Sequence, residues 1–315
     1  MPDAVIASGT SILNGNAMTR IIRKAKKNHW LFVLCTLGPV LALFTFIRII
    51  PIIRTAYYSL TNYTLVVPKP VFVGIANYMH MIRDGAFIQA FSHTLFITVA
   101  CVVLTLAVSL LFSVLLRRVE RTSSLYEMIY FVPVITPWVP ATVIWRWLFD
   151  PRFGLVNQLL HLVHIPGQSW LQQPDQIIVA IIIVSVWKTL GYYMVIYTVG
   201  LRNIPDLYYE AARIDGAGNG QQFRHITLPL LRPIVLFSSI MAIIQFFNVF
   251  TVAYVISSDV QGSPSYEYKV LVWEIYRNGF NFYKMGYASA EAMVLLAFIL
   301  VVILVQFRVV RYDVE

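Results

Sequence analysis

The chain has 315 residues, of which 58% are hydrophobic and only 12% charged, and its mean hydropathy is +0.70. A soluble chain of this length carries roughly 25% charged residues, because much of its surface must face water. The composition therefore excludes an ordinary soluble fold and favours a chain that spans a lipid bilayer. The formal net charge of +9 would suit nucleic-acid binding. However, the basic residues gather on one side of the predicted spans, so we expect no nucleic-acid partner.

Six apolar segments are long enough to cross a bilayer, since a helical crossing requires about 20 mostly apolar residues. They are Leu31–Ile53, Thr94–Leu116, Ile129–Phe149, Ile177–Val199, Ile234–Val255 and Ala288–Phe307. Pro133, Pro137 and Pro140 interrupt the third segment, which indicates a distorted helix beside a pathway. The expected fold is therefore all-α and integral to the membrane, with six transmembrane helices in one permease-like domain over residues 30–310.

Lys and Arg residues are distributed unevenly over the segments that connect these spans. One side has Arg20, Arg23, Lys24, Lys26, Lys27, Arg117, Arg118, Arg121, Arg202, Arg213, Arg224, Arg232, Arg308 and Arg311. The other side has only Lys69, Arg83, Arg152, Lys269, Arg277 and Lys284. The positive-inside rule then places both termini in the cytoplasm. Residues 1–29 would form one cytoplasmic tail, disordered in its first part, and residues 311–315 the other. The first span is long enough to remain as an uncleaved anchor, and Met18 is a second candidate for the start of translation.

The sequence shows no pattern typical of a catalytic or metal-binding site. The phosphate-binding GxxxxGK[ST] loop, the HExxH zinc motif and the GxSxG nucleophile elbow are all missing. His161 and His164 lie one helical turn apart without a third ligand, so we predict no metal site. We expect no catalytic residue and no cofactor on this chain. An intramembrane hydrolase has no catalytic pair to support it, and if the protein does work, the energy source lies elsewhere.

The segment between the fourth and fifth predicted spans, residues 203–233, has the features of a docking element. Pro205 suits the first position of a helix. Leu207, Ala211 and Ile214 then recur at helical spacing and form one apolar stripe. The pattern predicts a short amphipathic helix on the cytoplasmic side.

A glycine elbow is expected to follow this helix. Gly216 can end it in a left-handed conformation, and a second short helix is predicted at about Gln221–Thr227, ending before Pro229. A membrane span needs no such helix pair, whereas docking to a soluble partner does.

The same segment carries a pattern that resembles a known family. It reads Glu210-Ala211-Ala212-x-x-Asp215-Gly216-Ala217, followed by Phe223, Ile226, Leu228-Pro229 and Pro233. This pattern resembles the EAA loop of binding-protein-dependent ABC importer permeases. Further likeness to carbohydrate permeases of the maltose and glycerol-3-phosphate type covers most of residues 70–310. It rests on Ile144–Phe149, Gly154–Asn157, Trp187-Lys188, Gly191–Tyr193, Gly200-Leu201, Ile204-Pro205, Ile275–Arg277 with Phe280, and Met285–Ala290.

Three positions depart from the family pattern. Gly262-Ser263-Pro264 stands where Gly-Gly-Pro is frequent, Glu291 stands at an apolar position, and Tyr193 stands where sugar permeases often have Asn. These differences leave the class intact but weaken the transfer of sugar-contacting residues.

The resemblance implies a multi-pass protein of a prokaryotic plasma (inner) membrane that is a transport subunit and not an enzyme. It also implies several partners: a second and different permease subunit, two cytoplasmic ATPase subunits that bind ATP and Mg, and an extracytoplasmic solute-binding protein that delivers a sugar or oligosaccharide. The residues it assigns to the ATPase-coupling helices are Glu210, Ala211, Ala212, Asp215, Gly216 and Pro229.

Lys188 lies near the middle of the fourth predicted span, roughly 17 Å along it. A charge at this depth is costly and normally faces the helix bundle or water. Lys188 would therefore either line the pathway as a hydrogen-bond donor or form a structural ion pair with Glu291 or Glu127. The other pathway candidates are aromatic or amide side chains, which suit sugar rings and hydroxyl groups: Trp187, Tyr192, Tyr193, Gln245, Asn248 and Tyr254. Taken singly, each of them is better explained by bundle packing or an interfacial aromatic belt.

Two alternatives for the function remain open on the sequence alone. An importer of glycerol 3-phosphate or another non-sugar solute would give the charge of Lys188 a direct purpose. An ion-gradient-driven carrier would use Lys188 and Glu291 as a proton relay. The EAA pattern argues against the carrier, because such a protein has no ATPase to contact.

Overall fold

The regular structure of this protein is helical. The computed structural model describes residues 33–66, 69–116, 123–257 and 269–309. Within these ranges the regular elements are helices, beside one isolated antiparallel bridge between Thr61 and Phe72. The expected all-α class is confirmed for the described residues. The predicted tails and the Gly262–Pro264 departure lie outside them.

The chain divides into two compact units, Met1–Tyr57 and Tyr58–Glu315. The first contains most of a helix that runs from Val33 to Ser59 through a π-helical turn, η1 (Thr45–Ile49), into α2 (Ile50–Ser59). This helix continues six residues beyond the predicted end of the first span. Its apolar side chains are exposed, which suits a lipid-facing span.

The second unit contains the remaining helices. In chain order they are α3 (Ala76–Met81), α4 (Gly85–Leu116), α5 (Ser123–Ile135), α6 (Trp138–Leu148), α7 (Leu155–Leu162), α8 (Pro174–Arg202), α9 (Asp206–Ile214), α10 (Asn219–Gln222), η2 (Phe223–Thr227), α11 (Leu228–Phe247), α12 (Thr251–Ser257), α13 (Leu271–Tyr276), η3 (Arg277–Asn281) and α14 (Met285–Val309). Over all described residues, the helix Val33–Ser59 included, five helices are long and apolar enough to cross a membrane. The number is six if the bent pair α5–α6 counts as one span.

The third predicted span, Ile129–Phe149, is broken in two. Helices α5 and α6 meet at an angle of 108°. Pro137 lies at the break in an extended conformation, with φ −60° and ψ 148°, and its missing N–H cannot continue the helical hydrogen bonds. The expected distortion is observed, but it is a complete break and not a bend within one helix.

The helix that enters the fifth span also differs from the prediction. The second short helix was expected to end before Pro229. Instead, α10 and the π-helical turn η2 continue directly into α11. The N–H of Leu228 bonds to the carbonyl of Phe223, five residues back. In this wider turn, directly before Pro229, the backbone hydrogen bonds run to the fifth residue back and not to the fourth. The helix can therefore continue through the proline.

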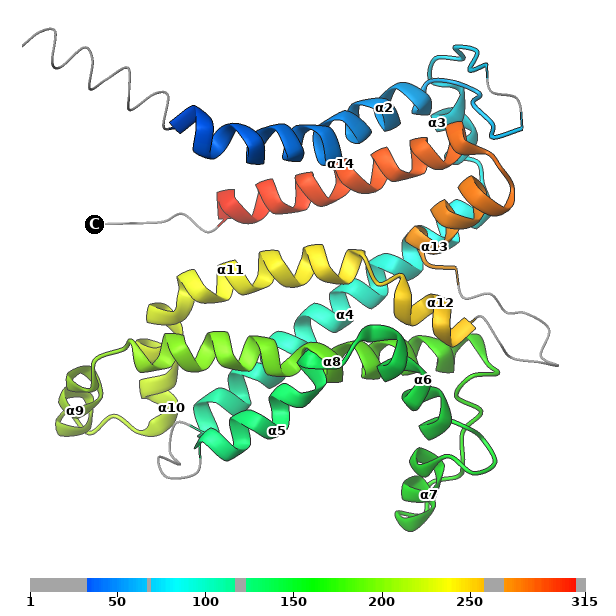
Figure 1. Cartoon of the computed structure of the whole chain (residues 1–315). Coiled ribbons are helices and arrows are strands. Elements are labelled where there is room, and N and C mark those ends of the chain that lie inside the picture. The colour runs from blue at the N-terminus through cyan, green and yellow to red at the C-terminus, as the bar shows by residue number, and fades with distance from the viewer. Residues whose placement is uncertain (1–32, 67–68, 117–122, 258–268, 310–315) are drawn as a thin grey trace, which may run out of the picture. The chain divides into compact units, whose positions relative to one another are not determined.

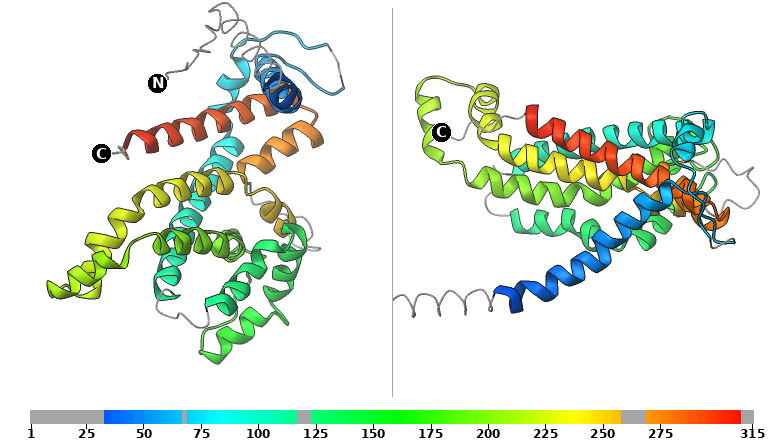
Figure 2. Two further views of the ribbon diagram at one scale, coloured as in Figure 1. Left: turned by 60° about the vertical axis from the view of Figure 1, so that its left-hand side comes forward. Right: turned by 90° about the horizontal axis from the view of Figure 1, so that it is seen from above.

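The core of the second unit forms where α4 crosses α8 and α11, as Figure 1 shows and Figure 2 repeats from two other directions. Buried serines connect the first two helices. Ser109 and Ser113 of α4 each donate a 3.0 Å hydrogen bond, to the carbonyl oxygens of Leu190 and Met194 of α8. Small residues and interhelical hydrogen bonds of this kind allow close helix packing in a membrane.

Candidate functional site

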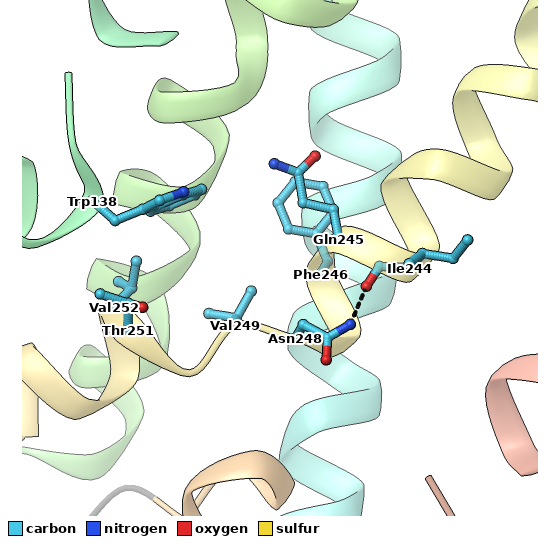
Figure 3. Close-up of a pocket in the computed structure, with 8 residues that line it drawn as sticks. All are labelled: Trp138, Ile244, Gln245, Phe246, Asn248, Val249, Thr251 and Val252. Carbon is cyan, nitrogen blue, oxygen red and sulfur yellow. Dashed lines mark hydrogen bonds between the residues drawn. The ribbon is translucent and has the colours of Figure 1, made fainter. Parts of the chain in front are cut away.

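A cavity of about 270 Å³ lies between two helix breaks. One break separates α5 from α6, and the other separates α11 from α12. The side chains that line the cavity come from both sides: Trp138, Ile244, Gln245, Phe246, Asn248, Val249, Thr251 and Val252 (Figure 3). This lining combines apolar side chains and one indole with amide and hydroxyl groups, and it contains no charged residue.

The cavity brings together three of the pathway candidates. Gln245 and Asn248 line it directly. Tyr193 is fully buried on α8, and its hydroxyl donates to the Oε1 atom of Gln245 at 3.0 Å. Gln245 is therefore oriented by a neighbouring helix, and its amide group is presented at the cavity wall (Figure 3).

The other aromatic candidates do not line this cavity. The Trp187 ring packs edge-on against Trp145, and the Tyr192 ring packs in the same way against Tyr193. Tyr254 stacks on Phe250. Trp187, Tyr192 and Tyr254 each expose more than a third of their surface, as expected for side chains that face lipid or a partner chain.

Sequence reasoning missed six of the eight residues that line the cavity, among them Trp138 and Thr251. Both begin a helix directly after a break. The position of Trp138 immediately after Pro137 could have identified it, because the residue after a helix-breaking proline begins the next helix and so lies beside the break. No comparable signal precedes Thr251.

Lys188 is buried behind the cavity wall, with 4% of its surface exposed. Its Nζ atom donates a 2.9 Å hydrogen bond to the carbonyl oxygen of Val134, in the last turn of α5. The same atom lies 5.1 Å from the centre of the Trp138 ring. Lys188 does not line the cavity.

The ion pair proposed for Lys188 with Glu291 is wrong. Glu291 is fully buried on α14, and both of its carboxylate oxygens accept from Nδ2 of Asn278, at 3.0 and 3.1 Å. The side chain of Glu127, the other proposed partner, lies outside the described residues. Lys188 needs no acidic partner, because the break after α5 leaves the carbonyl of Val134 within reach of its ammonium group.

The loop between α8 and α11 forms a second candidate site. Helix α9 occupies Asp206–Ile214, as the sequence predicts, and Gly216 has φ +79°, the expected left-handed conformation. The N–H of Ala217 then bonds back to the carbonyl of Ala212 at 2.8 Å. These contacts reproduce the glycine-terminated helix end.

Helix α9 is anchored on one face and open on the other. Tyr209 is buried, and its hydroxyl lies 2.9 Å from the hydroxyl of Thr227 in the π-helical turn. On the opposite face Leu207 is 71% exposed and Ile214 is 87% exposed. A polar surface helix would not expose such side chains, so this face has the character of a binding surface.

A shallow hollow lies beside the exposed face of α9. Its lining comes from the end of α9, the glycine elbow and the helix that follows: Ala212, Asp215, Gly216, Ala217, Gln221, Gln222, His225 and Ile226. Glu210 and Ala211 are exposed next to it. Pro229 is also exposed but belongs to the first turn of α11, one element further along the chain.

Comparisons with known proteins agree with this architecture. The family described as "Binding-protein-dependent transport system inner membrane component" matches residues 117–311. The probable ABC transporter permease protein YesP of Bacillus subtilis (strain 168) is 33% identical over 93% of this chain and 94% of its own. The sn-glycerol-3-phosphate transport system permease protein UgpA of Yersinia pestis is 30% identical over 91% of this chain and 96% of its own.

A solved structure supports the fold independently. A chain of the bacterial alginate ABC transporter, crystallised in complex with an alginate pentasaccharide-bound periplasmic protein, superimposes with a TM-score of 0.79. The two chains are 21% identical, and the match covers 91% of this chain and 96% of the other. At this identity the likeness concerns the fold alone.

Proposed function

The chain belongs to the family of inner membrane components of binding-protein-dependent transport systems, and from that premise we propose its solute, its partners and its coupling surface. It is a permease subunit of an ABC importer, so the alternative of an ion-gradient-driven carrier is set aside. The energy for transport then comes from hydrolysis of ATP, which partner subunits bind together with Mg.

We propose that the solute is a sugar or oligosaccharide that passes through the cavity between the two helix breaks. The observation that supports this choice is the uncharged lining. An indole face suits the apolar face of a sugar ring, while Gln245, Asn248 and Thr251 supply groups that exchange hydrogen bonds with hydroxyls. Unwound backbone beside a cavity is also typical of transport sites in membranes.

Glycerol 3-phosphate is the second candidate, because the related UgpA proteins are named for it. A phosphate would require a cation in the cavity to offset its charge. The nearby cation, Lys188, donates instead to the carbonyl of Val134 and lies behind Trp138. This arrangement favours a neutral solute.

The solute proposal can be tested through uptake. Cells that express the complete transporter should accumulate radiolabelled neutral oligosaccharides, and glycerol 3-phosphate should not compete with them. Mass spectrometry of the solute retained by the copurified binding protein gives an independent answer. Exclusive uptake of glycerol 3-phosphate would overturn the neutral-sugar proposal.

We further propose that both termini and the α9 loop lie in the cytoplasm, where α9 contacts one of two ATPase subunits. The exposed Leu207 and Ile214 would bury apolar surface against that subunit, and Glu210 would offer its carboxylate to a basic group. A second, different permease would complete the pathway. An extracytoplasmic binding protein would deliver the solute on the opposite side.

Substitutions in the loop test this coupling surface. Glu210→Lys reverses a charge at the contact, and Gly216→Pro is incompatible with φ +79°. Both should reduce uptake to background and release the ATPase during copurification, while the chain still inserts in the membrane.

Gly220→Ala is the matched control. It adds a methyl group in open space within the same loop and should transport normally. Unchanged uptake in both Glu210→Lys and Gly216→Pro would contradict the proposed coupling surface.

A further inference from the structure

We propose that Lys188 is a positioning residue: it holds the break between α5 and α6, and thereby the Trp138 wall of the cavity, without contacting the solute. The inference deepens the proposed function and rests on it, because it concerns the same cavity. It replaces both roles that the sequence suggested for this lysine, the solute ligand and the partner of an acidic residue.

The break leaves a backbone acceptor that needs a donor. In a continuous helix the N–H of Trp138 would bond to the carbonyl of Val134, four residues earlier. The 108° turn at Pro137 separates these groups. An unpaired carbonyl inside a membrane protein costs free energy. Lys188 supplies a donor at 2.9 Å, and a bond from a charged group is stronger than a neutral one.

The position of Lys188 depends on a close approach of α8 to α5. Gly191 lies one turn after Lys188, on the same face of α8. A Cβ atom at Gly191 would overlap the carbonyl oxygen of Tyr130, so only glycine lets the two backbones approach this closely. Gly191 thus sets the helix separation at which the Lys188 side chain reaches Val134.

The ammonium group also lies against the indole that faces the cavity. Its 5.1 Å separation from the Trp138 ring centre is within the range of a cation–π contact. The ring lines the cavity, as Figure 3 shows, whereas Lys188 does not. One cation therefore binds both sides of the break, a carbonyl at the end of α5 and a ring at the start of α6.

Burial of the charge follows from these same contacts. A lysine at this depth requires compensation, and the carbonyl dipole of Val134 and the face of the Trp138 ring provide it. The solute then meets the indole and the amide groups, while the ammonium remains behind the wall. Removing the charge should loosen Trp138 and the first turn of α6.

The experiment uses the complete transporter in proteoliposomes. Lys188→Met keeps the length of the side chain without its charge, and Lys188→Arg keeps a cation. Trp138→Phe and the double variant complete a cycle. If Lys188→Met does not accumulate, Lys188→Gln takes its place. Maximum uptake rates are measured for a radiolabelled neutral oligosaccharide and for glycerol 3-phosphate, and tryptophan emission is recorded without any solute.

The expected result has three parts. Lys188→Met lowers the maximum uptake rate by the same factor for every solute that the wild type transports, and Lys188→Arg recovers part of it. The tryptophan emission of Lys188→Met shifts, and the shift is missing when position 138 is Phe. In the Trp138→Phe background Lys188→Met causes a smaller loss than in the wild type, because the weaker phenyl contact has already reduced what the ammonium holds, while the bond to Val134 is lost in both cases.

Two results would overturn the proposal. A loss confined to glycerol 3-phosphate would make Lys188 a solute ligand, and an equally large loss in the Trp138→Phe background would separate it from the ring. Failure of the proposed function has a different signature. If the wild type transports no neutral sugar, the proposed solute is wrong, while the emission spectra still decide the role of Lys188.

Discussion

The two helix breaks that border the cavity are stabilised in different ways. At the α5–α6 break, Pro137 interrupts the helix and the carbonyl of Val134 accepts from Lys188, which belongs to a different helix. At the α11–α12 break there is no proline, and the side chain of Asn248 donates to the carbonyl of Ile244 one turn earlier, at 2.7 Å (Figure 3). The first break depends on tertiary packing, whereas the second is capped locally.

This difference makes the cavity wall at the α5–α6 break fixed and the wall at the α11–α12 break adaptable. Changing the first break requires α8 to move or Lys188 to release its acceptor. The second break can change its angle while its own side chain keeps the carbonyl satisfied, because the two partners are only four residues apart on the same helix. The local cap is also exposed beside the cavity, so water can replace it.

The largest effect should come from Gly191→Ala. The added methyl group meets the backbone of Tyr130, so α5 or α8 must shift and the first break must move with them. We expect a loss of about 3 kcal/mol in the free energy of unfolding, the upper range for an overpacked site, together with loss of uptake. Thermal unfolding of the detergent-solubilised transporter measures the first effect.

Gly200→Ala is the matched control for this variant, because it lies on the same helix. Its added methyl group would meet the side-chain ends of Ile234 and Leu231, which can adjust more readily than the backbone atoms that face Gly191. Its cost should be clearly smaller. Equal destabilisation by the two variants would show that backbone approach at Gly191 does not govern the first break.

A smaller effect is expected at the second break. Asn248→Ala removes the donor to Ile244, but water from the cavity can reach that carbonyl, so the cost should be about 1 kcal/mol or less. Uptake should fall more than stability, since Asn248 also lines the cavity. Measuring uptake and unfolding on the same variant separates the two contributions. A loss of stability as large as that of Gly191→Ala would contradict the distinction between the breaks.

The smallest effect is expected for Thr136→Ala. The Thr136 hydroxyl donates to the carbonyl of Val132 at 2.9 Å at an exposed site just before Pro137. Exposed substitutions of this kind usually change stability by less than about 0.5 kcal/mol. Uptake near the wild-type level would show that Thr136 does not hold the first break. A large loss would assign that role to the threonine.

Local rules predicted the parts of this molecule that depend on neighbouring residues. The distortion at Pro137, the extent of α9 and the left-handed Gly216 each follow from a few consecutive residues. The chemistry of amide groups also identified Gln245 and Asn248 as pathway candidates, and both line the cavity.

The remaining features depend on contacts between distant segments. The acceptor of Lys188 lies 54 residues earlier in the chain and exists only because another helix is broken. The sequence alone therefore suggested an acidic partner, the usual companion of a buried cation. Similarly, Pro229 predicted a helix end, but a π-helical turn placed directly before it allowed the helix to continue. That turn has no strong sequence signature.

The uninterrupted path from Asn219 to Phe247 has a mechanical consequence. One end adjoins α9 through the contact between Tyr209 and Thr227, and the other end carries Gln245 at the cavity. The helical segment is roughly 40 Å long at the usual rise per residue. A displacement of α9 would therefore reach the cavity through one continuous run of helix, in which the π-helical turn η2 and Pro233 are the positions where the run can bend.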